Sequence, residues 1–130
     1  GKSVAANFAG HRVLTDQSPR QGGEGSAPTP FDLFLTSIAA CMGYYALEFC
    51  QARRLATDGM ALQLDTERDR EAGLNRRVRV ALRLPEGFPP KYSKAILRAM
   101  GRCSVKRQME SPPEIEVIVE LPVPATGPHG

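Results

Sequence analysis

The feature that most constrains this chain is an apolar stretch of helical periodicity from Pro30 to Arg54. Between Leu33 and Leu47 it carries no charged side chain, and its large apolar residues recur three or four positions apart. Pro30 suits the first position of a helix, and Thr29 before it suits the N-cap. The sequence therefore predicts one long helix that is apolar nearly all round and must be covered on all sides.

The rest of the chain predicts a small α+β domain around this helix. Its 130 residues are enough for one domain, which we expect to span residues 1–130. Apolar and polar residues alternate in three runs, two further short strands split by Gly10 precede the long helix, and a second helical pattern follows a proline pair. The expected strands cover 2–8, 11–15, 60–69, 76–84 and 114–121, the second helix covers 91–103, and 104–110 form a turn or short helix.

The predicted order is β-β-α-β-β-α-β, with an antiparallel sheet and two main helices. Five short strands and one further helix cannot easily enclose the long apolar helix. We therefore expect a homodimer in which two such helices pack back to back between two sheets.

Composition limits the classes of partner. The net charge of +3 is spread along the chain, and the arginines of 76–83 alternate with apolar residues as on a solvated strand face, so no nucleic-acid partner is expected. The long apolar run lies between Asp32 and Glu48 and is shorter than the ~20 residues of a membrane span, so no membrane partner is expected. Three cysteines without a CxxC motif suit a reducing compartment, and we expect the cytoplasm.

A loop rich in proline, glycine and serine, from Asp16 to Thr29, leads into the long helix. It is too short to link two domains and long for an idle connection. We interpret it as a candidate lid or active-site wall.

Two cysteines lie on the apolar faces of the two predicted helices. Cys41 is near the middle of the first helix, and Cys103 is at the end of the second. Free cysteine often acts as a small buried hydrophobic residue, so Cys41 is either structural or reactive. Cys50 lies half a turn round from Cys41 and is interpreted as structural. A zinc site of Cys41, Cys103 and His11 would lack a close ligand pair and a fourth ligand, so no metal is expected.

A reactive Cys41 needs a group that stabilises its thiolate. The helix dipole fades within the first turn, and Cys41 lies eleven residues beyond Pro30. A cation from elsewhere would then be required, and Arg20 in the loop is the best placed by sequence, with Arg12 second. Each is equally well explained as a plain surface arginine. Buried without such a partner, the thiol would be inert.

Three stretches resemble the OsmC/Ohr family of small thiol-dependent proteins that handle organic hydroperoxides. They are the loop GGEGSAPTP, the helix segment DLFLTSIAACMGYYALEFC and the segment RCSVKRQM. The resemblance covers about 16–109 and includes the spacing from Pro30 to Cys41. It implies an OsmC-like fold and an intertwined homodimer, in which sheets wrap two central helices and the active sites lie at the subunit interface.

The resemblance also implies an activity and residue roles. Cys41 matches the peroxidatic cysteine, Cys103 the resolving cysteine, and Arg20 is the nearest match to the activating arginine. The implied activity is thiol-dependent reduction of organic hydroperoxides in oxidative or osmotic stress defence. It needs no bound cofactor and uses an external dithiol reductant, which in relatives is a lipoylated protein.

One position departs from the family pattern. The characterised peroxidases carry a glutamate directly after the helix-opening proline, which pairs with the arginine, whereas Phe31 stands there in this chain. Asp32 would point about 100° away, and Glu24 is a candidate substitute. The alternative function is therefore a non-enzymatic OsmC-like dimer that binds a small molecule or senses redox state.

Overall fold

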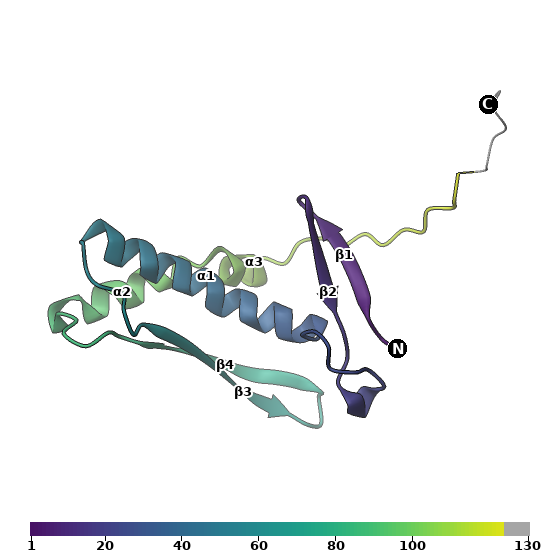
Figure 1. The fold of residues 1–130 in the computed structure, drawn as a ribbon, viewed down its shortest axis with the longest axis horizontal. Helices are drawn as coiled ribbons and strands as arrows, with labels where there is room; N and C mark the ends of the chain where they lie inside the picture. The colour runs from purple at the N-terminus through teal and green to yellow at the C-terminus, as the bar shows by residue number, and fades with distance from the viewer. Residues whose placement is uncertain (124–130) are drawn as a thin grey trace.

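The computed structural model describes residues 1–123, and its longest element is the helix α1 (Pro30–Ala52), shown in Figure 1. A capping box begins this helix. The Asp32 N–H donates to Thr29 Oγ1 at 3.1 Å, and the Thr29 N–H donates to Asp32 Oδ2 at 3.3 Å. Just beyond the helix, Arg54 adopts a left-handed conformation with a φ of 54°. The predicted long helix is confirmed.

A short hairpin precedes α1. Strand β1 (Val4–Phe8) pairs with β2 (His11–Thr15) in an antiparallel sheet. Ala9 and Gly10 join the strands, both at positive φ, 51° and 78°, which suits the tight twist of a two-residue hairpin loop. In Figure 1 this hairpin stands beside one end of α1, away from the other strands.

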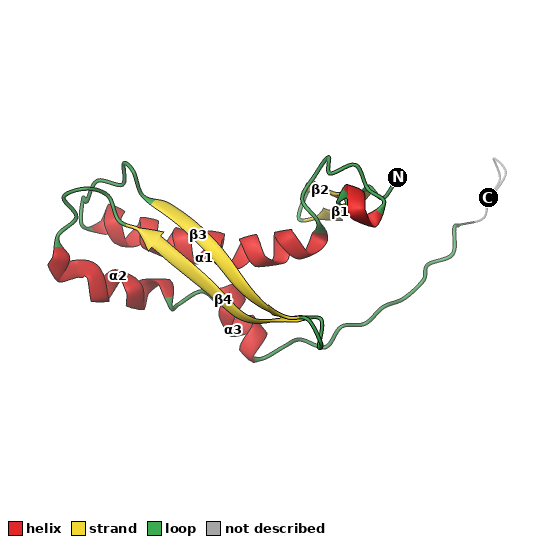
Figure 2. Cartoon of the chain, turned by 90° about the horizontal axis from the view of Figure 1, so that it is seen from below, coloured by secondary structure: helices red, strands yellow, loops and turns green. Residues whose placement is uncertain are grey.

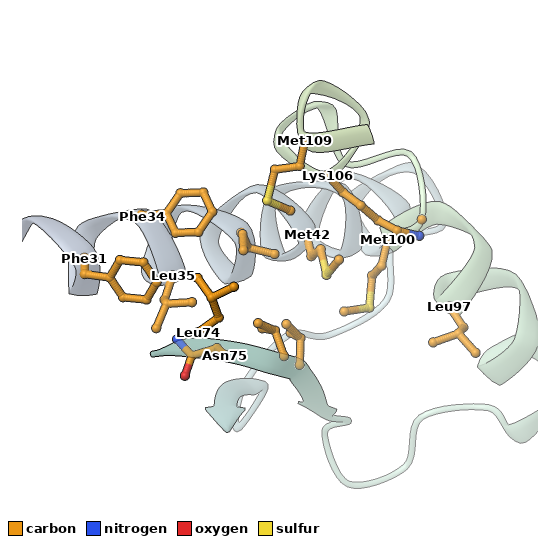
Figure 3. Close-up of a pocket in the computed structure, with 14 residues that line it drawn as sticks. Phe31, Phe34, Leu35, Met42, Leu74, Asn75, Leu97, Met100, Lys106 and Met109 are labelled. Atoms are coloured by element: carbon orange, nitrogen blue, oxygen red, sulfur yellow. The ribbon is translucent and has the colours of Figure 1, made fainter. Parts of the chain in front are cut away.

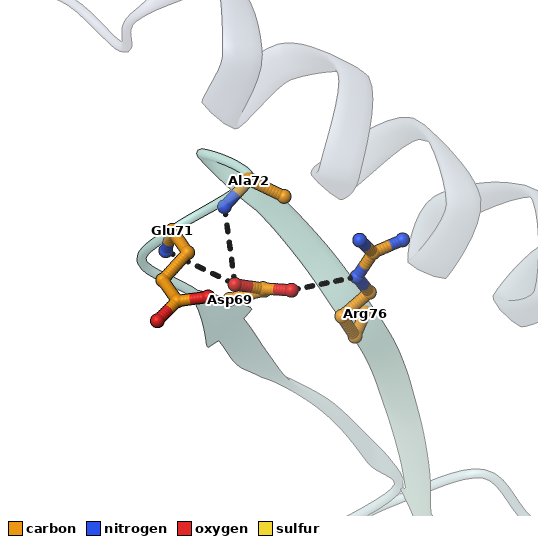
Figure 4. Close-up of polar contacts among 4 residues, drawn as sticks. All are labelled: Asp69, Glu71, Ala72 and Arg76. Atoms are coloured by element: carbon orange, nitrogen blue, oxygen red, sulfur yellow. Dashed lines mark hydrogen bonds and ion pairs between the residues drawn. The ribbon is translucent and has the colours of Figure 1, made fainter.

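A longer hairpin follows α1. Strand β3 (Ala61–Asp69) pairs with β4 (Leu74–Arg83), again antiparallel and in a separate sheet. Asp69 closes its turn by accepting two backbone N–H groups at 3.0 and 3.1 Å and the Arg76 Nε–H at 3.1 Å, as Figure 4 shows. These four strands were predicted, but they form two two-stranded sheets and not one.

Two short helices complete the fold. A 3-10 turn, η2 (Pro90–Tyr92), leads into α2 (Ser93–Met100), and α3 (Ser104–Glu110) follows directly. The predicted helix over 91–103 therefore ends three residues early, because the chain turns at Gly101 to begin α3. Helix α2 packs on α1, and the main core lies between these two helices. Its buried members are Ala46, Phe49, Cys50, Ile96, Ala99 and Met100.

The β3–β4 hairpin lies along α1, as Figures 1 and 2 show. The two elements approach closely at Gly43, where a Cβ atom would collide with the Leu62 side chain. This glycine in the interior of α1 lets the strand come near the helix backbone.

The predicted last strand, 114–121, is wrong for the single chain. In the structure this segment is extended but pairs with no strand, and its apolar side chains are exposed; Val117 is 86 % exposed. A strand needs a neighbour that accepts and donates its backbone hydrogen bonds, and in the described residues both sheets form without this segment. The alternating pattern is present in the sequence, but in the single chain this segment forms no strand.

Much apolar surface is left uncovered in the single chain. The accessible area is 10739 Å², about 1.6 times the area that a compact monomer of 14.1 kDa exposes. Large apolar side chains are exposed on the first hairpin and along the terminal segment; Phe8, for example, is 82 % exposed. This large exposed area agrees with the expectation that five short strands and one further helix cannot easily enclose the long apolar helix.

Helix α1 is also long enough and apolar enough by composition to cross a membrane. Of its most apolar window, 22 % is buried within the chain. The core helix of a soluble protein meets the same criterion, and α2, α3 and β3 all pack on this helix. Its 23 residues exceed the apolar run counted from the sequence, because flanking polar residues are helical too.

Candidate active site

The structure brings Cys41 and Cys103 together. Cys41 lies on α1, and Cys103 is the N-cap of α3, which packs against α1. Neither cysteine forms a disulfide, and Cys103 lies near enough to Cys41 to lower the pKa of the Cys41 thiol. The sharp turn between α2 and α3 produces this proximity, because it folds the chain back onto α1 just where Cys103 ends the turn.

Cys41 is half-buried and lies among hydrogen-bond donors. Its Sγ is 3.6 Å from Ser104 Oγ. Burial opposes ionisation of this thiol, but four groups outweigh it: the Val105 backbone N–H, the Ser104 hydroxyl, the Cys103 thiol and the Ser104 backbone N–H. Together they lower the pKa of Cys41 to about 7. A substantial fraction of Cys41 is therefore thiolate near neutral pH.

Cys103 has the opposite electrostatic environment. It is fully buried; its thiol donates to the Ile38 carbonyl oxygen at 3.9 Å, and its sulfur accepts the Lys106 N–H at 3.4 Å. Burial raises the pKa of Cys103 above its ordinary value, and the neighbouring Cys41 raises it further, against the effect of the Lys106 N–H. The pair therefore consists of one readily ionised thiol and one thiol that keeps its proton.

The two arginines suggested by the sequence are elsewhere in the single chain. Arg20 lies in a 3-10 turn, η1 (Pro19–Gln21), and is exposed, and Arg12 is exposed on β2. In the described part of the chain, the groups that lower the pKa of Cys41 all belong to residues 103–105, and neither arginine is among them. The sequence predicts a cation beside Cys41; in the described residues of the single chain, hydrogen-bond donors lower the pKa of this thiol. The positions of these donors relative to Cys41 depend on how α3 packs on α1, and no local sequence motif predicts that packing.

At the start of α1, Phe31 occupies the position where the family pattern has a glutamate. Phe31 is half-exposed and packs on Phe34, with 5.5 Å between ring centroids. The Asp32 carboxylate is already engaged in the capping box. The Glu24 backbone N–H donates to Asp16 Oδ2 at 3.1 Å, so this part of the loop is held toward Asp16. The helix start is thus apolar at Phe31 and structural at Asp32.

Asp16 organises the loop before α1, a role that the sequence analysis missed. Its buried carboxylate accepts the Gln17 N–H at 2.8 Å, the Ser26 N–H at 3.0 Å and the Ser26 hydroxyl at 2.7 Å, besides the Glu24 N–H. The Ser26 hydroxyl and then the backbone N–H groups lower the pKa of Asp16 to about 2. Gly23 lies so close that a Cβ atom there would strike the Gln17 carbonyl. An aspartate that opens a Gly/Ser-rich loop was the available signal.

A large apolar cavity is lined by neighbours of the two cysteines in the chain, though by neither cysteine itself. It has a volume of about 730 Å³ and is bounded by α1, β4, α2 and α3 (Figure 3). On α1 it is lined by Phe34, Ile38 and Met42, so two immediate helical neighbours of Cys41 form part of its wall. Lys106, at the α3 side, is the charged residue among its described lining side chains. The cavity has the size and apolar lining of a small-molecule site.

Within residues 1–123, no three histidine, cysteine, aspartate or glutamate side chains are grouped to hold a metal ion.

Comparison with known proteins identifies a matching family model and a solved structure of similar fold. The family model described as OsmC-like protein matches residues 23–118. No curated protein matches the chain. Among solved structures, the chain is similar to a protein from Psychrobacter arcticus 273-4 that is assigned, by its name alone, to an osmotic stress induced and detoxification response. The two share 18% identity over 83% of this chain and 87% of that chain, with a TM-score of 0.67. At this identity the similarity shows the fold.

Proposed function

Because this chain belongs to the family of OsmC-like proteins, we propose that it reduces organic hydroperoxides, with Cys41 as the attacking thiol and Cys103 as the resolving thiol. The observation that carries the proposal is the unequal pair: a Cys41 thiol with a pKa of about 7 beside a buried Cys103 that keeps its proton. A family with a stress and detoxification role is consistent with such a pair.

The reaction needs two steps and no metal. The Cys41 thiolate attacks the distal oxygen of the hydroperoxide, the O–O bond breaks, and the alkoxide takes a proton and leaves as an alcohol. Cys41 is then a sulfenic acid. The Cys103 sulfur attacks the Cys41 sulfur, and the hydroxyl group leaves with a proton as water, so that a disulfide forms. An external dithiol returns both cysteines to thiols by exchange, and we propose a lipoylated protein for this step.

The apolar cavity supports an organic substrate. Phe34, Ile38 and Met42 present carbon and sulfur surface next to the helical turn that carries Cys41. Burying the carbon chain of a hydroperoxide there is worth ~25 cal/mol per Å² of apolar area, a gain that hydrogen peroxide does not share. We therefore expect a preference for organic hydroperoxides over hydrogen peroxide.

We also propose that the working form is a homodimer. A second copy would bury the apolar area that one copy leaves exposed. Its strands could also form backbone hydrogen bonds with segment 114–121, which pairs with no strand in the single chain. Arg20 stays a candidate activator, since the loop that carries it leads into α1 and is exposed for contact with a second copy. A mechanism that starts from two free thiols suits the reducing cytoplasm.

The test is a stoichiometric titration with cumene hydroperoxide, followed by peptide mapping of disulfides. We expect one equivalent to consume two thiols and produce a Cys41–Cys103 disulfide. Cys41→Ser should abolish turnover with a dithiol reductant. Cys50→Ala is the matched control, because Cys50 is buried in the α1–α2 core, and it should keep turnover. If both Cys41 and Cys103 stay reduced in the wild type, the enzyme proposal is wrong.

The cavity also favours a second candidate, a non-enzymatic protein that binds a small apolar molecule. The same titration separates the two functions. Unreacted thiols together with saturable binding of an apolar fluorescent probe, weakened by Ile38→Asp, would favour the binding protein. Disulfide formation favours the enzyme.

A further inference from the structure

We propose that Ser104 is a further residue of the catalytic site, whose hydroxyl donates a hydrogen bond to Cys41 Sγ and holds the ionised sulfur for attack. The inference deepens the proposed function and rests on it for its role in catalysis. The contact itself, between Ser104 Oγ and Cys41 Sγ at 3.6 Å, joins the first residue of α3 to the middle of α1.

The direction of this hydrogen bond depends on the charge of Cys41. Either atom can donate while Cys41 is a thiol. A thiolate has no proton, so the Ser104 hydroxyl must then be the donor. A hydrogen bond that the thiolate accepts stabilises the thiolate relative to the neutral thiol. The contact therefore strengthens when Cys41 becomes the nucleophile.

The backbone around Ser104 is held in place independently of its side chain. Cys103 caps α3 by accepting the Lys106 N–H at 3.4 Å, and the Arg107 N–H donates to the Cys103 carbonyl at 3.1 Å. The backbone N–H groups of Ser104 and Val105 also lie near enough to Cys41 to lower the pKa of its thiol. Within the described residues, Cys41 is the hydrogen-bond partner of Ser104 Oγ, and the hydroxyl has no second bond that would indicate a purely structural role.

Ser104 is exposed, and alanine and serine are both tolerated in a first helical turn. Removing the hydroxyl should therefore leave α3 folded. This makes Ser104 different from Cys103, whose sulfur both caps the helix and contacts the Ile38 carbonyl.

The experiment measures the pH dependence of Cys41 alkylation by iodoacetamide, resolved by peptide mass spectrometry, without any peroxide. In the wild type the midpoint should lie near pH 7. In Ser104→Ala we expect the midpoint to rise by on the order of one pH unit, the size expected for one hydrogen bond to a charged group. The matched control, Ser93→Ala at the start of α2, should leave the midpoint unchanged.

A second pair of variants removes any dependence on the folding of Ser104→Ala. Ser104→Thr keeps a hydroxyl and Ser104→Val has nearly the same shape without one. We expect the wild-type midpoint in the threonine variant and the raised midpoint in the valine variant. Equal midpoints in these two folded variants would overturn the inference.

The result is distinguishable from a failure of the proposed function. If the wild type does not react with cumene hydroperoxide, the peroxidase proposal fails, whatever the alkylation midpoints are. If the wild type reacts but the hydroxyl-free variants keep both the midpoint and the peroxide rate, Ser104 has no catalytic role and the peroxidase proposal stands.

Discussion

The unequal ionisation of the cysteines predicts a selective pattern of alkylation. The perturbation is a scan of pH from 5 to 9 on the reduced protein. Donors from residues 103–105 lower the pKa of Cys41 to about 7, whereas burial raises the pKa of Cys103 and of Cys50. A free cysteine ionises with a pKa of about 8.5. Cys41 should therefore be the first site to react at every pH in this range.

The magnitude follows from two opposing factors. At pH 7, half of Cys41 is thiolate if its pKa is about 7, whereas about 3% of a free thiol is, a ~16-fold difference. A thiolate of lower pKa is also a weaker nucleophile, and a Brønsted coefficient of about 0.4–0.5 removes a factor of ~4 to 6. The net advantage over a small free thiol is then about 3-fold at pH 7 and about 6-fold at pH 5. Above about pH 8 the free thiol becomes the faster of the two, and the Cys41 rate becomes constant.

The assay is pseudo-first-order alkylation with iodoacetamide, with glutathione as the reference thiol in the same tube. Peptide mass spectrometry assigns the label to each cysteine. Cys103 and Cys50 should stay nearly unlabelled until the protein unfolds, because both are fully buried. A Cys41 midpoint at or above pH 8.5, or faster labelling of Cys103, would refute the electrostatic reasoning.

Three further perturbations test the fold around the site. Ile96→Ala should lower the free energy of unfolding by about 2–5 kcal/mol in a urea titration, since it empties part of the α1–α2 core. The control, Leu97→Ala, should lower it much less, because the Leu97 side chain is 68 % exposed. Equal losses would contradict the packing of Ile96 in the core. The folded pKa of Asp16, about 2, lies below its unfolded value of ~3.9, so its contribution to stability is complete above pH ~4 and is lost as the pH falls toward 2. Thermal melts should show this loss in the wild type and not in Asp16→Asn; parallel pH profiles would refute it. Val117→Lys should shift the dimer to monomer in light scattering, and Glu116→Lys should not; a wild-type mass of one chain would contradict the dimer proposal.

The parts of the fold that the sequence predicted are those determined locally. Thr29, Pro30 and Asp32 form a helix start whose hydrogen bonds join neighbours in sequence, so the beginning of α1 was readable. Gly10 between two short segments located the first hairpin, and alternation of apolar residues located the second, since each hairpin pairs adjacent segments.

The parts that sequence reasoning missed depend on distant or absent partners. The segment 114–121 has a strand pattern, but its state depends on a neighbour that a single copy does not provide. The donors at Ser104 and Val105 approach Cys41 because α3 packs on α1, and a backbone N–H leaves no mark in the sequence. The sequence can therefore indicate a charged side chain such as Arg20 as an activator, but not these backbone donors.

The most direct test of the central claim is to trap the product of the first chemical step. In Cys103→Ser the resolving thiol is absent, and serine preserves an N-cap for α3. One equivalent of cumene hydroperoxide is added in the presence of dimedone, which reacts with sulfenic acids, and the adduct is mapped by peptide mass spectrometry. Attack by Cys41 predicts one adduct, at Cys41, that forms faster with cumene hydroperoxide than with hydrogen peroxide. An unmodified Cys41, or an adduct at Cys50 in its place, would contradict the account.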